Sequence, residues 1–314
     1  MAGFSVIVPA KNAAQDLKSC LSAITKSLPT GGEVIVVDDG SIDETPQIAE
    51  AAGAIIVRSV ESRGAATARN LGVAAAQGEI LVFLDADVVV HPDTIARLLA
   101  KFEGNTKLAA VMGSYDDSPL HKTVVSEFRN LLHHYVHHQG NKEAVTFWTG
   151  CGAMRRRNFD EVGGFVNGLL MEDIDLGLRV TDRGGRIELD PTIQVKHRKR
   201  WTLRSMIVTD VFSRAIPWMK LMEGRRGMRN DLNTRWEDRV SALLVMLGIL
   251  LIWRWEGWVA LALATAVRWD WHWFLVRKRG WWFALRAMPL HWLYLFYSTL
   301  AFGWMKVRAL RPLG

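Results

Sequence analysis

Short runs of β-branched and aromatic residues alternate with helix-like segments from residue 4 to residue 87. The runs span residues 4–10, 33–39, 54–58 and 79–87. Leu17, Leu21 and Ile24 recur at helical spacing between the first two runs. Strands that alternate with helices through short connections are typical of parallel sheets. The predicted fold class is therefore α/β, with a mostly parallel sheet covered by helices on both faces.

Two of the predicted strands end in acidic pairs, Asp38-Asp39 and Asp85-Ala86-Asp87. The carboxyl ends of parallel strands share one edge of a sheet, where open α/β folds bind their ligands. Two carboxylates there can hold a hard divalent cation, which in turn can hold a diphosphate. For an isolated Asp-x-Asp the alternative is a polar strand end that faces solvent. No Gly-Lys-Ser/Thr loop follows either strand, so phosphate would be held by a metal and by basic side chains.

Four motifs in a fixed order favour a ligand-binding edge over a strand end that merely faces solvent. They are Val8-Pro9-Ala10-Lys11-Asn12, Val37-Asp38-Asp39-Gly40-Ser41, Arg63-Gly64 followed by Ala68-Arg69-Asn70, and Asp85-Ala86-Asp87. Together they resemble the family 2 glycosyltransferases, which have the GT-A fold of nucleotide-diphospho-sugar transferases. The resemblance covers residues 4 to 200, because it continues through Trp148-Thr149-Gly150-Cys151, Val162-Gly163-Gly164-Phe165 and Met171-Glu172-Asp173.

The resemblance implies a site for a nucleotide-sugar donor, expected to be a UDP-sugar. The donor-binding residues that it implies are Pro9, Ala10, Asn12, Asp38, Asp39, Arg69, Asp85, Gly150 and Arg200. It also implies a metal cofactor, Mg²⁺ or Mn²⁺, which Asp87 holds on the diphosphate with help from Asp85. His197 is a further candidate ligand. Such a cation would offset the charge that develops on the leaving nucleoside diphosphate.

Asp173, next to Glu172, matches the position of the general base that acts on the acceptor hydroxyl in this family. Inversion at the anomeric carbon would follow from a single in-line displacement. Repulsion among Glu172, Asp173 and Asp175 would raise the pKa of one of them, which suits a base. The alternative is an acidic residue in the first turn of a helix, where the helix dipole favours it.

The segment His197-Arg198-Lys199-Arg200-Trp201 occupies the place where processive polymer synthases of the family carry Gln-x-x-Arg-Trp. Arg200 could still reach the diphosphate, and Trp201 could offer a ring to the acceptor. His197 could bind the metal or the phosphates. Alternatively, it belongs to a basic segment that lies on anionic lipid headgroups. Because His replaces Gln, we expect one sugar per cycle, with processive synthesis as the alternative. The predicted acceptor-side residues are Trp201, Trp148 and Cys151.

Four histidines lie at i, i+4 spacing between residues 131 and 139: His133, His134, His137 and His138. That spacing can bind zinc, but no glutamate completes a His-Glu-x-x-His motif. We favour an amphipathic helix at the acceptor side or at a membrane.

Tryptophan is distributed unevenly, because 13 of the 14 tryptophans follow residue 200. With long apolar runs, this skew favours a bilayer interface over nucleic acid as the partner behind the formal charge of +7. Two cysteines are too few for a disulfide framework, and no secretory signal precedes the first strand. We therefore expect no nucleic-acid partner and a catalytic domain that faces the cytosol.

These patterns divide the chain into three segments. Residues 1–202 form the predicted GT-A catalytic domain, residues 203–239 amphipathic membrane-interface helices, and residues 240–314 an all-α membrane region. The last region has two to three hydrophobic segments, interrupted by Arg268, Asp270 and Arg286, which we expect to lie against protein or at an interface. This predicts a protein of the inner (cytoplasmic) membrane.

The leading hypothesis is an inverting, metal-dependent glycosyltransferase with a lipid-linked or membrane-proximal acceptor, such as a polyprenyl phosphate or a glycolipid. A sugar-phosphate nucleotidyltransferase has a similar sheet but carries a glycine-rich basic loop where this chain has Pro9-Ala10-Lys11-Asn12. A non-catalytic membrane scaffold would not need all the acids. The sequence favours no particular sugar, acceptor, metal ion, number of membrane segments or oligomeric state.

Overall fold

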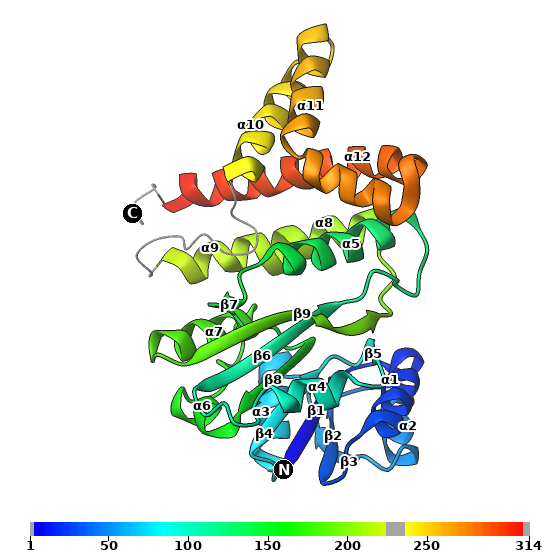
Figure 1. Ribbon diagram of the computed structural model, residues 1–314, viewed down its shortest axis with the longest axis vertical. Helices are drawn as coiled ribbons and strands as arrows, with labels where there is room; N and C mark the ends of the chain where they lie inside the picture. The colour runs from blue at the N-terminus through cyan, green and yellow to red at the C-terminus, as the bar shows by residue number, and fades with distance from the viewer. Residues whose placement is uncertain (1–2, 224–235, 310–314) are drawn as a thin grey trace. The chain divides into compact units, whose positions relative to one another are not determined.

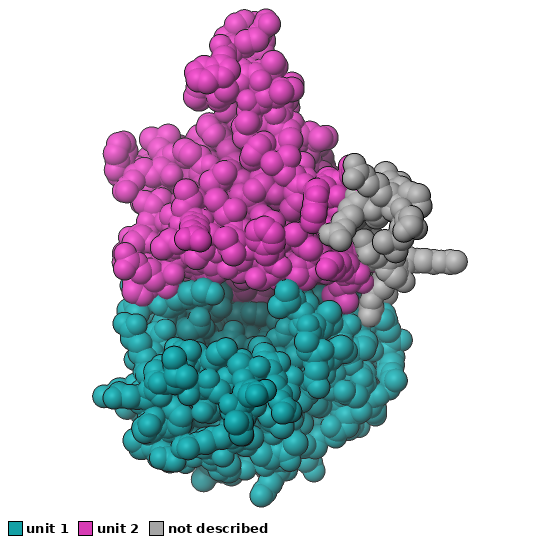
Figure 2. All heavy atoms as spheres, turned by 180° about the vertical axis from the view of Figure 1, so that it is seen from behind, with its two compact units in different colours: residues 1–120, 140–199 teal, residues 121–139, 200–314 magenta. Residues whose placement is uncertain are grey.

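The computed structural model describes residues 3–223 and 236–309. The chain forms two compact units, which Figure 2 shows in different colours. Unit 1 comprises residues 1–120 and 140–199, and unit 2 comprises residues 121–139 and 200–314. The predicted catalytic segment 1–202 therefore differs from unit 1 chiefly at residues 121–139, which group with the C-terminal helices.

Unit 1 is built on a nine-stranded sheet in the order β3-β2-β1-β4-β8-β6-β9-β5, with β7 paired to β9 (Figure 1). The strands are β1 (Phe4–Ala10), β2 (Gly32–Asp39), β3 (Ile55–Ser59), β4 (Ile80–Leu84), β5 (Val88–Val90), β6 (Leu108–Tyr115), β7 (Glu143–Ala144), β8 (Cys151–Arg155) and β9 (Arg186–His197). The four strands predicted up to residue 87 are confirmed, although the fourth ends at Leu84. Asp85, Ala86 and Asp87 therefore form the turn that follows β4.

The sheet is mixed, not mostly parallel as predicted. Strands β3, β2, β1 and β4 run parallel, and so does the pair β6 and β9. By contrast, β8 is antiparallel to both β4 and β6, and β5 and β7 are antiparallel to β9. The prediction rested on the strand–helix alternation before residue 87, and the antiparallel pairings all involve strands after that point.

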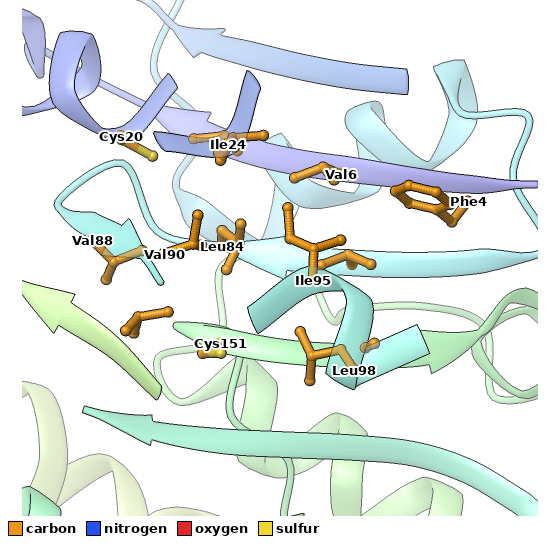
Figure 3. Close-up of a cluster of buried hydrophobic side chains, with 14 of the residues drawn as sticks. Phe4, Val6, Cys20, Ile24, Leu84, Val88, Val90, Ile95, Leu98 and Cys151 are labelled. Carbon is orange, nitrogen blue, oxygen red and sulfur yellow. The ribbon is translucent and has the colours of Figure 1, made fainter. Parts of the chain in front are cut away.

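Helices cover both faces of the parallel half of the sheet, because alternate residues of a strand point to opposite faces. Val36 of β2 packs with Ile24 in the cluster of which Figure 3 shows a part. Its neighbours Ile35 and Val37 pack with Ala68 on the other face. The helices of unit 1 are α1 (Ala14–Ser27), α2 (Thr45–Ala51), α3 (Ala65–Ala75), α4 (Thr94–Ala100), α6 (Arg156–Glu161) and α7 (Glu172–Asp182).

The described part of unit 2 is helical. Its elements are α5 (Val124–Gln139), α8 (Leu203–Val208), the π-helix η1 (Thr209–Ala215), α9 (Ile216–Glu223), α10 (Trp236–Leu250), α11 (Trp255–Val267) and α12 (Trp269–Ala309). Gly280, at φ 81°, breaks α12 into two helices. The core of the unit includes Phe128 of α5 together with Trp271 and Phe283 of α12. Of the predicted interface helices 203–239, residues 224–235 lie outside the described part of the chain.

The predicted membrane segments are wrong, and so is the inner-membrane location that rested on them. Within residues 3–223 and 236–309, no helix combines the length and the apolar character that crossing a bilayer requires. Helices α10 and α11 have 15 and 13 residues, whereas a span needs ~20. The longer α12 is broken at Gly280 and carries Arg286 and Pro289 in its second part.

Two of the charged residues that interrupt the apolar runs, Arg268 and Asp270, are paired within unit 2. Arg268 is buried and forms ion pairs with Asp238 and Asp270. Asp270 also accepts a hydrogen bond from the hydroxyl of Tyr135. The apolar residues between these charges therefore belong to a folded helical unit with its own polar contacts.

Candidate active site

The carboxylates of Asp85 and Asp87 lie at the carboxyl end of β4, with 31% and 32% of their side chains exposed. Helix α3 holds one of them, because Arg69 Nη2 donates to Asp85 Oδ1 over 2.8 Å. The end of β9 faces the other, with His197 Nε2 3.6 Å from Asp87 Oδ2. The backbone N–H of Arg198 also donates to the Asp87 carbonyl. The pair is thus fixed between two elements that lie far apart in the sequence.

The surroundings move the pKa values of these two acids in opposite directions. Burial and the like charge of Asp87 raise the pKa of Asp85, although Arg69 opposes the shift. Burial also acts to raise the pKa of Asp87, but hydrogen bonding to His197 and the charges of His197 and Lys199 outweigh it and lower the value. Asp87 is therefore the better anion of the two.

His197 is held by an aromatic stack that the sequence analysis missed. Its ring lies parallel to that of Tyr115, with centroids 4.1 Å apart. The edge of Trp148 meets the Tyr115 ring at 4.9 Å. The available signal was the position of Tyr115 at the end of a buried strand, immediately before Asp116 and Asp117. The stack fixes the imidazole beside Asp87.

The turn that opens α7 carries the predicted base. Met171 precedes it in the left-handed conformation, with φ 66°. Glu172 accepts a hydrogen bond from Arg69 Nη1, so one guanidinium joins this turn to Asp85. Burial, followed by the charge of Glu172, raises the pKa of Asp173 to about 7, while Arg69 acts to lower it. A carboxyl with this pKa can exchange a proton near neutral pH.

The loops after β1 and β2 are linked by side-chain hydrogen bonds. The backbone N–H of Ile42 donates to Asn12 Oδ1, and the backbone N–H of Asn12 donates to Ser41 Oγ, each over 2.9 Å. The backbone N–H of Ser41 also donates to Asp38 Oδ1. Pro9 and Ala10 lie in register with Val37 and Asp38. The register thus brings the predicted donor-binding residues of the first two motifs to one edge.

Asp39 organises the next loop. Its carboxylate accepts hydrogen bonds from Ser62 Oγ and from the backbone N–H groups of Arg63 and Gly64, at 2.8–3.0 Å. Burial acts to raise its pKa, but these hydrogen bonds outweigh it and lower the value. The carboxylate therefore serves as the anchor of the segment that leads into α3.

The predicted residues around β8 have different surroundings. A Cβ at Gly150 would lie 2.3 Å from the Trp148 ring, so the absence of a side chain lets that ring approach. The thiol of Cys151 lies in the hydrophobic core, and burial raises its pKa to about 12. It is therefore inaccessible to an acceptor.

Arg200 and Trp201 belong to unit 2. Arg200 is exposed, whereas Trp201 is buried in the helical core, where its ring faces the Arg129 guanidinium at 5.8 Å. Its backbone N–H donates to Ser126 Oγ. The predicted acceptor ring is thus used in packing within unit 2.

The described residues contain no group of three or more His, Cys, Asp and Glu side chains arranged to hold a metal. A cation bound at Asp85, Asp87 and His197 would therefore need further ligands to complete its coordination shell. On α5, the rings of His134 and His138 are stacked with centroids 3.9 Å apart, and those of His133 and His137 lie tilted with centroids 4.0 Å apart. No further ligand in the part of the chain that is described completes a zinc site there.

Residues 5–163 match the family described as glycosyl transferase family 2. The chain belongs to this family. The matched segment is a glycosyltransferase domain, which favours that activity over the nucleotidyltransferase and the non-catalytic scaffold considered above. Two curated relatives are each 26% identical: the pre-mycofactocin glycosyltransferase of Mycobacterium tuberculosis and the poly-beta-1,6-N-acetyl-D-glucosamine synthase of Staphylococcus aureus. The alignments cover 79% and 67% of this chain but only 51% and 57% of the relatives, so the chain spans about half their length.

Solved structures share the fold. A mannosyltransferase from Pyrobaculum calidifontis, in complex with GDP-Man and Mn²⁺, has a TM-score of 0.65 at 22% identity, covering 97% of this chain and 88% of its own. Glucosyl-3-phosphoglycerate synthase from Mycobacterium tuberculosis, in complex with Mn²⁺ and UDP-glucose, has a TM-score of 0.53 at 23% identity, covering 73% and 80%. The likeness establishes a GT-A-like mixed α/β sheet.

The anchoring role of Asp39 gives a pH-dependent stability. Its pKa in the folded state lies below the unfolded value of about 3.9. The carboxylate therefore stabilises the fold fully above that value and loses this contribution as the pH falls through the folded pKa. We expect Asp39→Asn to lower the free energy of unfolding by about 1–3 kcal/mol at pH 7, with a smaller difference from the wild type below about pH 4.

Urea denaturation at several pH values measures both quantities. Asp160→Asn, at an exposed aspartate, is the matched control and should change little. A constant difference between wild type and Asp39→Asn from pH 7 to pH 3 would contradict the anchoring role.

Proposed function

We propose that this glycosyltransferase transfers one sugar per cycle, with inversion, from a nucleotide-sugar to a lipid-linked acceptor. The observation that carries the proposal is the arrangement around Arg69. This side chain connects Asp85 at the strand edge to Glu172, the neighbour of a carboxyl with a pKa of about 7. The proposed donor site and the proposed base thus share contacts with one buried guanidinium.

The donor is proposed to lie along the edge formed by Pro9, Asn12, Asp38 and Asp39, with its diphosphate near Asp87. Solved proteins with the same fold contain UDP-glucose or GDP-Man together with Mn²⁺. This supports a nucleotide-sugar donor, and we retain a UDP-sugar as the expected one.

The residues at the edge fit a divalent cation that is shared with the substrate. Mg²⁺ in phosphate-binding sites is held by one or two carboxylates plus substrate phosphates. Asp87, with its lowered pKa, and Asp85 would supply those carboxylates, and His197, whose Nε2 lies 3.6 Å from Asp87 Oδ2, is proposed as a further contact of the metal or the phosphates. When bound, Mg²⁺ or Mn²⁺ would offset negative charge on the leaving nucleoside diphosphate.

Asp173 is proposed to take the proton from the acceptor hydroxyl as the sugar is transferred. Burial and the like charge of Glu172 keep the pKa of Asp173 high, and Arg69 limits the rise. A base is needed for a hydroxyl acceptor, whereas an ionised phosphate acceptor carries no proton to remove. The effect of replacing Asp173 therefore distinguishes a glycolipid from a polyprenyl phosphate.

The surface of unit 2 supports an acceptor with an apolar part. Large apolar side chains around the α10–α11 connection are exposed, including Leu250 (78%), Trp253 (95%) and Trp255 (73%). The burial of Trp201 supports transfer of a single sugar, because that ring is not presented as a platform for a growing chain.

The first prediction concerns the metal. Turnover of a UDP-sugar should require Mg²⁺ or Mn²⁺ and should stop with EDTA. Asp87→Asn should lower turnover about 100-fold, because the charge on the leaving diphosphate loses its partner. Product release is measured by chromatography at fixed metal concentration, with Asp160→Asn as the control. Full activity of Asp87→Asn, or of the wild type in EDTA, would refute the metal role.

The second prediction concerns the base. Asp173→Asn should lower transfer to a hydroxyl acceptor by about 10²–10⁴-fold while leaving the affinity for the nucleoside diphosphate unchanged. Because the base acts in its ionised form, kcat/KM should rise with pH up to about pH 7 and then level off. Calorimetry with the diphosphate and initial rates from pH 5 to pH 9 measure the two effects. A pH-independent rate across this range would contradict the assignment.

The third prediction concerns the acceptor. A polyprenyl phosphate, a glycolipid and a water-soluble sugar are offered in detergent with the same radiolabelled donor. One of the lipid-linked acceptors should be labelled at least about tenfold faster than the soluble sugar, because burying even two methylene groups at ~0.8 kcal/mol each exceeds that factor. Equal labelling of the soluble sugar would rule out the lipid requirement and leave the donor chemistry intact.

A further inference from the structure

Asn70, the neighbour of Arg69 on α3, contacts the segment of residues 163–171, which leads to the proposed base Asp173. Its Nδ2 donates to the carbonyl of Phe165 over 2.8 Å and to Asn167 Oδ1 over 3.0 Å. In return, the backbone N–H of Phe165 donates to Asn70 Oδ1 over 3.0 Å. One turn earlier, the hydroxyl of Thr67 donates to Asn167 Oδ1 over 3.1 Å. Helix α3 thus holds this segment through four hydrogen bonds.

The segment has little regular structure of its own. Gly163, Gly164 and Gly168 have φ values of 78°, 70° and 75°, and Met171 follows at 66°. These left-handed conformations belong to no helix or strand. Its path is therefore set by contacts with its neighbours. One of these is close, because a Cβ at Gly164 would lie 2.9 Å from Asn70 Oδ1.

Two other contacts fix the segment beside the site. Phe165 is buried, and its ring packs on that of Phe83 in β4, with centroids 5.4 Å apart. Arg179 of α7 donates to the carbonyls of Val162 and Gly164. The same segment is thereby tied to β4, which ends immediately before Asp85, and to the helix that begins at Glu172.

We propose that Asn70 is a positioning residue for the transfer reaction. It holds residues 165–167 so that the turn carrying Asp173 keeps its place relative to Asp85 at the end of β4. This inference rests on the proposed function. Arg69 and Asn70 then have complementary roles. Arg69 binds Asp85 and Glu172, and Asn70 fixes the path of the segment that leads to Glu172.

The chemistry of the contact requires an amide. Only Asn or Gln combines an acceptor oxygen with two donor hydrogens on one planar group. At this position Asp would keep the acceptor but would place a carboxylate against the Phe165 carbonyl and Asn167 Oδ1. Displacing a reacting group by about 1 Å can lower a rate by about 100-fold. A loss of catalysis with donor binding retained would therefore reveal the positioning role.

The test compares Asn70→Asp and Thr67→Val with Asn141→Asp, which changes an exposed asparagine of unit 1. Transfer kinetics give kcat and both KM values, and calorimetry with UDP and Mn²⁺ gives the affinity for the donor product. Thermal melting checks that each variant is folded. Adding Thr67→Val keeps the test informative if Asn70→Asp fails to fold.

We expect Asn70→Asp to lower kcat for transfer about 100-fold and Thr67→Val about fivefold, with UDP affinity within twofold of wild type and no effect of Asn141→Asp. Wild-type kcat in both variants, or a loss of UDP binding parallel to the loss of kcat, would overturn the positioning role. Wild-type protein that neither binds UDP nor turns over any nucleotide-sugar would instead refute the proposed function.

Discussion

The arrangement of the active site depends on one buried guanidinium. Arg69 is 5% exposed and binds Asp85 through one nitrogen and Glu172 through the other. Burial lowers the pKa of an arginine, but the charges of Asp85 and Glu172 more than compensate and keep this one ionised. Removing such a charge would leave two acids, together with Asp173, to repel one another in a poorly solvated place. The guanidinium therefore allows the proposed donor edge and the proposed base to lie side by side.

The sheet supplies the frame for this contact. Parallel pairing of β1, β2 and β4 places Pro9, Asp38 and Asp85 at successive carboxyl ends. Helix α3 approaches the same edge, because Asp39 anchors the loop at Arg63 and Gly64 that leads into it. Antiparallel pairing of β5 with β9 then brings in His197 and its aromatic stack from the end of β9.

The parallel strands and the acids at their ends were predictable, because both are encoded over stretches of fewer than ten residues. The order of β6, β8 and β9 was not, since it depends on pairings between distant segments. The contact between Arg69 and Glu172 was not predictable either, because 103 residues separate them in the sequence. The tryptophan-rich tail misled the prediction for a different reason. Some of its apolar residues, such as Trp271 and Phe283, fill the core of unit 2, and the apolar runs are divided among α10, α11 and α12, of which α12 is broken at Gly280.

The segment from His197 to Trp201 shows why a motif should be judged residue by residue. By comparison with processive synthases, the sequence predicted contacts with the donor or the acceptor for His197, Arg200 and Trp201. In the structure, the boundary between the two units falls after Lys199. His197 completes a stack beside Asp87, whereas Trp201 is buried against Arg129 among the helices. A mobile polymer needs an exposed ring to slide on, and a packed ring cannot provide one. The division of the motif therefore supports a role for its first residue at the donor and a structural role for its last.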